Sequence, residues 1–182
     1  MKRLFMPAAF VAALVAIATL SARADDGPKM PKDVQHGLLA NSMLVTKEPN
    51  NTGLLTGVHH IYVNSVGAGR FKRGGSTTYP DGTVFVDDVR EFTLDDGVYH
   101  EAGRKFVTVM VKDSKKYAET GGWGFGRFVD GKAVDEAQHK TCFTCHSSNA
   151  SVKEHDFVSL STLNPIGSST RNATRFLRRH CV

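Results

Sequence analysis

The sequence predicts a single α+β domain in which several short strands form a sheet and a few helices flank it. Its 182 residues are 41% hydrophobic and 23% charged, which is the composition of an ordinary globular protein and excludes disordered, collagenous and multi-span membrane proteins. The middle of the chain has short runs rich in Val, Ile, Phe, Tyr and Thr that nearly alternate with polar residues, as strands do. Segments on either side of these runs have apolar residues at helical spacing.

The first 24 residues have the pattern of a secretory signal peptide. Met1–Arg3 carry positive charge, Leu4–Leu20 are almost wholly apolar, and Ala22-Arg23-Ala24 fits the small-x-small rule for signal peptidase. A single membrane anchor is the alternative interpretation, but the apolar run is short for a span. We therefore expect residues 1–24 to be removed and the mature chain to be periplasmic, without membrane attachment after cleavage.

The charge of the chain does not indicate a nucleic-acid partner. After the leader, basic residues are interspersed with acidic ones, with the exception of the tail Arg175–His180. This tail is either a solvated helix end or a docking surface for an acidic redox protein. A soluble redox partner protein is therefore expected, and residues 159–182 are expected to form a loosely packed extension.

The elements of the domain are expected in the following order. A helix is predicted over Asp33–Val45, and a short helix over Ser65–Arg73. Strands are predicted for the runs VHHIYVN, TVFVDDVREF, KFVTVMVKD and GWGFGRFVD, over residues 58–64, 83–92, 105–113 and 122–130. Tyr79-Pro80-Asp81-Gly82 is expected to be a turn, because Pro presets φ and Gly accepts a positive φ. A helical turn over Lys115–Glu119 and a helix over Val134–His146 complete the domain.

The motif with the clearest chemical meaning is Cys142-Phe143-Thr144-Cys145-His146, a CxxCH sequence. In an exported protein this is the attachment signature of a c-type haem. Two thiols on one helical turn can each form a thioether with a haem vinyl group, and the adjacent His reaches the iron from the same side. The alternatives are a thioredoxin-like redox pair, half of a zinc site or a structural disulfide. We predict one covalently bound haem c per chain.

The late position of this motif indicates the kind of haem protein. A small electron-transfer cytochrome c has a Met ligand well downstream of CxxCH, and no methionine follows His146. A cytochrome c′ is a four-helix bundle, which the predicted strands contradict. We therefore expect an open sixth position that binds nitric oxide, hydroxylamine, carbon monoxide or peroxide. A six-coordinate electron carrier that uses a His or Met110 is the alternative, although a core role is the simpler expectation for Met110.

The order of motifs along the chain resembles that of the cytochrome P-460 family, which includes the cytochrome c′-beta proteins. The resemblance rests on HHIYVN, YPDGTVFV, VMVKDSKKYAETGGWGF, and CFTCH followed by HDFV, and it covers Val34 to Val158 of the haem domain expected over residues 25–158. It implies an antiparallel β-sheet with a few helices, a homodimer, and one haem c with a five-coordinate iron. By this resemblance Cys142 and Cys145 hold the haem and His146 is the proximal ligand.

The resemblance also implies a structural signature and a point of division within the family. The Tyr117-to-Phe125 block is the signature, and its Trp123 and Phe125 are expected in the core. Cytochromes P-460 that oxidise hydroxylamine carry a lysine bonded to the porphyrin on the strand after the PDG turn, whereas the c′-beta relatives lack this bond and bind nitric oxide. Asp87 occupies the place where that lysine is expected.

Strand alternation places Phe85 and Asp87 on one face, so both would line the distal side of the haem if that face is the haem face. The alternative is that Phe85 is plain core and Asp87 is a surface residue. The other lysines considered for the cross-link are Lys72, Lys105 and Lys112.

A carboxylate at Asp87 is suited to take protons from an N-hydroxylated ligand, and an aromatic ring at Phe85 to exclude water and larger ligands. An imidazole is suited to hydrogen-bond the ligand or to carry a proton, and the histidines considered for this role are His59, His60 and His100. With Asp87 we select His60 as the catalytic candidate. His139, His155 and His180 are expected on the surface.

Two functions are therefore predicted as alternatives. The first is a periplasmic haem oxidoreductase that acts on hydroxylamine or nitric oxide and passes electrons to a soluble cytochrome. The second is a nitric oxide binding protein without turnover.

Overall fold

The computed structural model describes residues 27–48, 53–73, 78–134, 137–148 and 156–158. The predicted signal peptide and the predicted C-terminal extension lie outside these residues, as do His155 and His180. No helix in the described ranges is long and apolar enough to cross a membrane.

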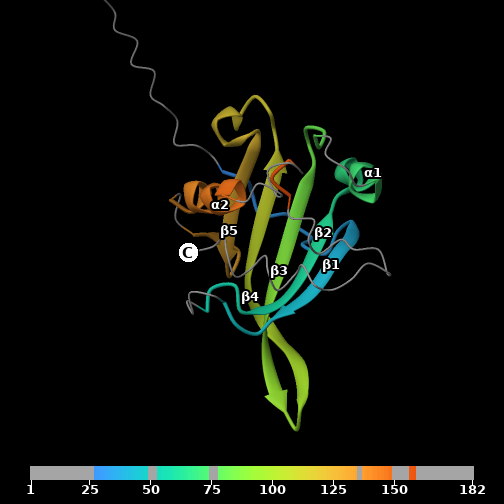
Figure 1. The fold of residues 1–182 in the computed structure, drawn as a ribbon, viewed down its shortest axis with the longest axis vertical. Coiled ribbons are helices and arrows are strands. Elements are labelled where there is room, and N and C mark those ends of the chain that lie inside the picture. Colours follow the sequence, from blue (N-terminus) through green and yellow to red (C-terminus); the bar gives the residue numbers. More distant parts are fainter. Residues whose placement is uncertain (1–26, 49–52, 74–77, 135–136, 149–155, 159–182) are drawn as a thin grey trace, which may run out of the picture.

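Six strands form one antiparallel sheet in which each strand pairs with the next along the chain (Figure 1). The strands are β1 (Leu38–Val45), β2 (Gly57–Val63), β3 (Val84–Asp95), β4 (Val98–Lys112), β5 (Trp123–Val129) and β6 (Lys132–Ala133). The sheet and its helices confirm the predicted α+β class and the antiparallel arrangement that the resemblance implied.

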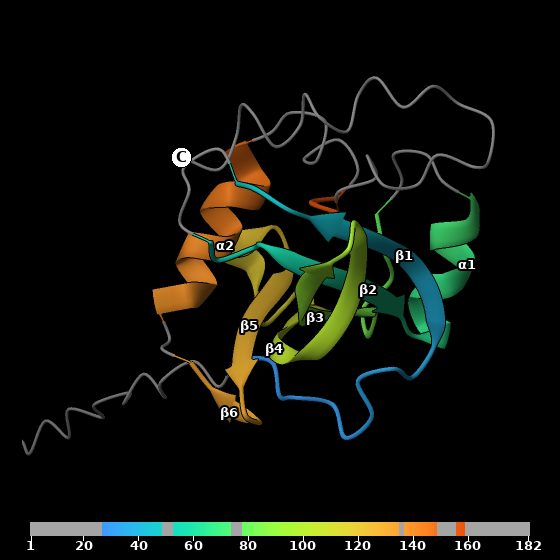
Figure 2. The same ribbon diagram turned by 90° about the horizontal axis from the view of Figure 1, so that it is seen from below.

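Two helices lie at opposite edges of this sheet (Figure 2). Helix α1 (Ser65–Arg73) contacts β1 and β2 and has the predicted bounds, whereas α2 (Ala137–Ser148) contacts β5 and begins and ends slightly later than predicted. The short 3-10 turn η1 (Ala118–Thr120) overlaps the helical turn expected before the GGWGF sequence.

The prediction of a helix over Asp33–Val45 is wrong, because residues 38–45 form strand β1. This segment pairs with β2, with Met43 opposite His59 and a register shift between Leu39 and Asn41. Periodicity alone does not separate a short buried strand from a helix. Pairing with β2 satisfies the backbone groups on one edge of this segment, and this tertiary contact decides the conformation.

Alternation along the strands divides the sheet into two faces. Phe85, Met110 and Phe125 lie opposite one another on β3, β4 and β5 and share the face on which Cys142 and Phe143 of α2 pack, which we call the α2 face. The buried cluster on the α2 face consists of Val63, Tyr79, Phe85, Trp123, Phe125 and Val158. The cluster on the opposite face consists of Val34, Val86, Val107, Val109 and Phe128.

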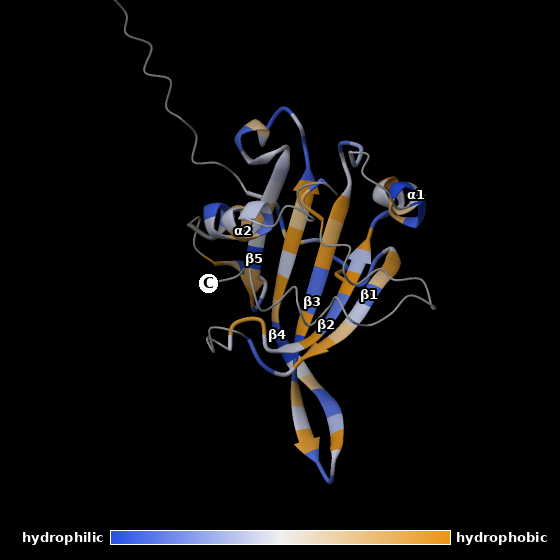
Figure 3. Ribbon diagram, in the orientation of Figure 1, coloured by the Kyte–Doolittle hydropathy of each residue, from blue (hydrophilic) through white to orange (hydrophobic). Residues whose placement is uncertain are grey.

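Strands β3 and β4 continue past Arg90, where pairing with β2 ends, as a two-stranded arm that projects from the body (Figures 1 and 3). Leu94, Val98 and Tyr99 on this arm are 59%, 54% and 49% exposed. The arm was predicted only in part, because both strands were expected to stop where the apolar alternation weakens.

Candidate haem site

Helix α2 carries the whole CxxCH motif on the β5 side of the α2 face. Cys142 is a free thiol, packs against the buried cluster and has a raised pKa because burial disfavours the thiolate. Cys145 is disulfide-bonded, so a thioether at Cys145 requires that this bond be reduced first. Cys142 is thus a free thiol on a helix that packs against an apolar cluster, which suits the attachment of a porphyrin.

His146 is held as a neutral imidazole with one nitrogen ready to bind a metal. Its Nδ1 lies 2.7 Å from the carbonyl oxygen of Phe157, and since a carbonyl only accepts, Nδ1 carries the proton. Burial lowers the pKa of His146, although the Phe157 hydrogen bond opposes this shift. Nε2 therefore presents a lone pair, which is the state required of an axial haem ligand.

The GGWGF block supports the segment that holds His146. Gly121 has φ +66°, and a Cβ there would lie 2.2 Å from the ring of Phe157. Similarly, a Cβ at Gly124 would lie 2.4 Å from the ring of Tyr117. Trp123 and Phe125 are buried in the cluster of the α2 face, as predicted, and the ring of Phe125 lies 5.2 Å from that of His146.

Phe85 and Asp87 share the α2 face, as strand alternation predicted. Phe85 is buried against Tyr79 and Trp123, with ring centroids 5.3 and 6.1 Å away. One oxygen of Asp87, Oδ2, lies 2.8 Å from Nδ1 of His59. The other oxygen, Oδ1, is buried and has no hydrogen-bond partner among the described residues.

His59 keeps Asp87 in this position from the neighbouring strand. Its Nε2 donates to the carbonyl oxygen of Leu55 over 2.7 Å, which leaves Nδ1 facing Asp87. Burial opposes a charge on His59, but the hydrogen bond and charge of Asp87 and the Leu55 carbonyl outweigh it, so the pKa of His59 is raised. Asp87 and the Leu55 carbonyl thus favour the protonated form of His59.

A comparison with protein families matches residues 31–159 to Cytochrome P460. The chain belongs to the cytochrome P460 family. No curated protein sequence matches it. The family assignment confirms the suspected resemblance and supports a haem cofactor. Among the described residues no group of three or more His, Cys, Asp or Glu is placed to hold a metal ion.

This cytochrome P460 family member has one row of side chains across the α2 face that carries polar atoms without partners. The row runs over five strands through Asn41, Ile61, Asp87, Thr108 and Arg127, each opposite the next. Nδ2 of Asn41, Oδ1 of Asp87 and Nε of Arg127 are buried without a hydrogen-bond partner in the described part of the chain. Buried groups of this kind call for a ligand or water.

Two of the histidines considered for the distal side do not lie on it. His60 is on the opposite face, where Nδ1 bonds the hydroxyl of Ser42 at 2.9 Å and Nε2 bonds Glu101 at 2.5 Å. His100 is exposed on the arm. The structure therefore brings Asp87 together with His59 and not with His60, because adjacent residues of a strand point to opposite faces.

The lysines considered for a porphyrin cross-link are placed elsewhere. The Nζ of Lys105 donates to the carbonyl oxygens of Gly53 and Thr56. The Nζ of Lys112 donates to Asp156, and Lys72 is exposed on α1.

Met110 and His139 both pack against other side chains of the domain. Met110 packs against the cluster of the α2 face, as its core interpretation predicted. The prediction that His139 lies on the surface is wrong, because its Nδ1 accepts a hydrogen bond from the backbone N–H of Phe125 at 3.0 Å and its ring packs on Tyr117 and Phe125. The signal that sequence reasoning missed is the helical spacing of His139, Cys142, Phe143 and His146, which places them on one side of α2.

Proposed function

We propose that this protein is an exported cytochrome with a single haem c, which reacts with small nitrogen compounds and exchanges electrons with a soluble redox protein. The haem would be held by thioethers from Cys142 and Cys145, with His146 as axial ligand. When bound, the haem supplies an iron site for a small ligand and a route for electrons. The apparent signal peptide supports a periplasmic location.

The observation that carries the reaction is the carboxylate of Asp87, a partly exposed side chain with one buried oxygen. Its Oδ1 has no hydrogen-bond partner among the described residues, and His59 holds its other oxygen. Hydroxylamine has N–H and O–H protons that must leave when it is oxidised, and a carboxylate within hydrogen-bond distance is a suitable acceptor. Phe85 is buried on the same face, and its ring would help to keep water away from a bound ligand. Oxidation of hydroxylamine is therefore the proposed activity.

The second candidate function is nitric oxide binding without turnover. It is favoured by Asp87 itself, which occupies the place where the resemblance leads us to expect the cross-linking lysine. Nitric oxide has no proton to lose, so the carboxylate would then affect the bound ligand only through its charge.

The first test is the absorption spectrum of the ferrous protein, produced with haem c maturation. A Soret band far to the red of ordinary haem c would reveal a lysine cross-link and contradict the place assigned to Asp87. An ordinary five-coordinate high-spin spectrum would agree with it. Turnover of hydroxylamine with an artificial electron acceptor then separates the two functions, because a stable nitrosyl adduct without turnover would leave only the binding protein.

The proposal includes a homodimer in which the arm is the contact surface. Phe92 and Tyr99 stack edge to face on it, with ring centroids 5.5 Å apart, and Leu94 is exposed beside them. Exposed apolar side chains gathered on a projecting hairpin are typical of an interface. Light scattering should give a dimer for the wild type and a monomer for Leu94→Asp. Val66→Asp, at an exposed position of α1, is the control and should leave the dimer intact.

A further inference from the structure

A buried ion pair lies beside the segment that holds His146. The Nζ of Lys112, at the end of β4, is 2.7 Å from Oδ1 of Asp156, and the two side chains are only 3% and 9% exposed. Nζ also donates to the carbonyl oxygen of Gly121 over 2.9 Å and lies 5.0 Å from the centroid of the Trp123 ring. A lysine with this many fixed contacts is an anchor and not a mobile surface charge.

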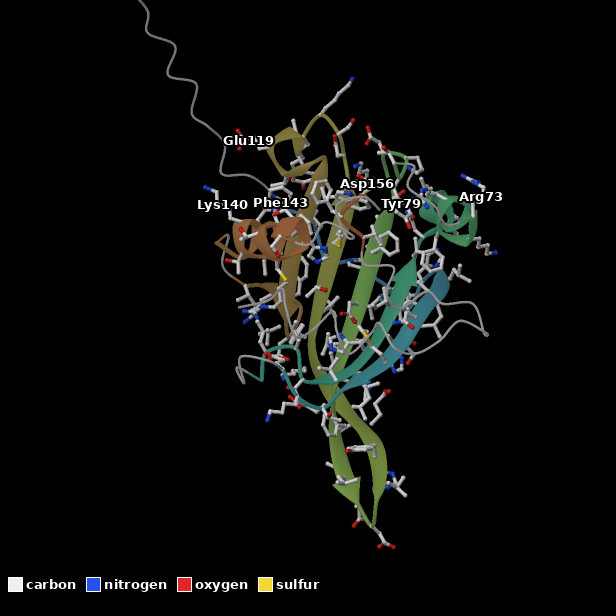
Figure 4. All side chains as sticks on the ribbon, viewed as in Figure 1. Arg73, Tyr79, Glu119, Lys140, Phe143 and Asp156 are labelled. Atoms are coloured by element: carbon white, nitrogen blue, oxygen red, sulfur yellow. The ribbon has the colours of Figure 1, made fainter. Side chains whose placement is uncertain are left out.

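Asp156 joins this anchor to the turn that leads into the neighbouring strand β3. Its second oxygen, Oδ2, accepts the backbone N–H of Tyr79 at 2.7 Å, so that one carboxylate connects β4 with the turn that precedes β3. Figure 4 shows Asp156 beside Tyr79, in the region between α1 and the Phe143 side of α2. Both of its oxygens are thus engaged, whereas Oδ1 of Asp87 has no partner among the described residues.

The residue after Asp156 provides the carbonyl that His146 uses. Asp156 and Phe157 have φ of +56° and +62°, a conformation that residues with a side chain adopt only when their surroundings enforce it. The ring of Phe157 packs on Phe143 at 5.5 Å and occupies the space that Gly121 leaves open. The carbonyl of Phe157 is therefore held in place by the contacts of Asp156, the residue before it, and by the packing of its own ring.

We propose that Lys112 and Asp156 are positioning residues that fix the hydrogen bond from His146 Nδ1 to Phe157, and thereby set how strongly Nε2 of His146 donates to a haem iron. A well-aligned hydrogen bond at Nδ1 makes the imidazole more electron-rich, which stabilises ferric over ferrous iron. The inference rests on the proposed role of His146 as axial ligand, but it is independent of whether hydroxylamine or nitric oxide is the ligand.

The experiment compares Lys112→Met, Asp156→Asn and the double variant with the wild type, all as haem-loaded full chains. The iron–histidine stretching band of the ferrous protein should move to lower frequency in the single variants. The ferric–ferrous equilibrium constant should shift about tenfold toward ferrous iron, which is about 59 mV for a one-electron couple. Asp156→Asn keeps an oxygen that Lys112 can bond, so it should accumulate as folded protein even if Lys112→Met does not.

The matched control is Lys105→Met, since Lys105 lies on the same strand and also donates to backbone carbonyls, but far from Asp156 along β4. It should leave both readouts unchanged. If only the charge of the pair mattered, the double variant would restore the wild-type values, whereas loss of positioning predicts that they stay shifted. Unchanged values in both single variants, or an equal shift in Lys105→Met, would overturn the inference. Failure to bind haem through Cys142 and Cys145 would instead contradict the proposed function.

Discussion

The two sides of the candidate haem site differ in how their polar groups are used. On the His146 side, Nδ1 of the imidazole, both oxygens of Asp156 and the ammonium of Lys112 all have partners. On the Asp87 side, Oδ1 of the carboxylate is buried without one among the described residues. An unsatisfied buried polar group costs about 1–3 kcal/mol, so proteins keep one mainly where it has a use.

This difference indicates a division of labour. The contacts on the His146 side hold its polar groups in place, as an axial haem ligand would require if it is to keep one geometry through each change of oxidation state. On the Asp87 side, Oδ1 is an acceptor without a partner among the described residues, and His59 fixes the carboxylate through its other oxygen. Four experiments test this comparison.

The largest expected effect is that of Asp87→Asn on hydroxylamine oxidation. An amide of nearly the same shape cannot take a proton, so the turnover rate should fall by about 100-fold or more, as for loss of a general base. Nitric oxide affinity of the ferrous protein should change little. Asp95→Asn, an exposed carboxylate on the same strand, is the control and should turn over like the wild type. Equal turnover in Asp87→Asn would remove Asp87 from the reaction.

The second largest effect is expected on folding stability, when Gly121 on the His146 side is replaced by Ala. Gly121→Ala has to adopt a left-handed conformation and displace the ring of Phe157, so we expect a loss of about 2–3 kcal/mol in the free energy of unfolding by urea. Gly97→Ala, with φ +79° but open space around it, should lose only about 1–2 kcal/mol. If the two losses are the same, the contact of Gly121 with Phe157 contributes nothing.

A smaller effect is expected from the pH dependence of the His59–Asp87 pair. The pKa of His59 is raised in the folded chain, against its burial, by Asp87 and the Leu55 carbonyl. The stabilisation from this pair is therefore complete below the unfolded pKa of about 6.5 and is lost as the pH rises through the folded pKa. The stability difference between wild type and His59→Gln, about 1 kcal/mol at acidic pH, should decrease as the pH rises. A difference that grows with pH would show that the pair is uncharged.

The smallest effect is expected at His60. Because it lies on the opposite face, bonded to Ser42 and Glu101, His60→Gln should leave hydroxylamine turnover and nitric oxide binding at wild-type values. A loss of turnover comparable to that of Asp87→Asn would contradict the assignment of the two faces.

Local patterns predicted the parts of the site that lie within one element. The CxxCH spacing located Cys142 and His146 on a helix, and the period of two placed Phe85 and Asp87 on one face. The same period separates His59 from His60 but does not say which of them faces Asp87. That choice depends on the register of β2 against β3, which is a tertiary property.

Contacts between distant parts of the chain were not predictable in this way. Lys112 and Asp156 are 44 residues apart, and each alone has the pattern of a solvated charge at the end of an element. Strand β1 was assigned to a helix for a related reason, because its apolar residues fit both periods and only pairing with β2 distinguishes them.

The strand order has a consequence for the time course of folding. Since each strand pairs with its predecessor in the chain, the sheet assembles through short-range closures, and such topologies fold quickly. The contact between Asp156 and Tyr79 spans 77 residues, so closing this loop costs more chain entropy than closing each hairpin of the sheet. We therefore expect the sheet to form first and the segment that follows the CxxCH motif to dock on it last.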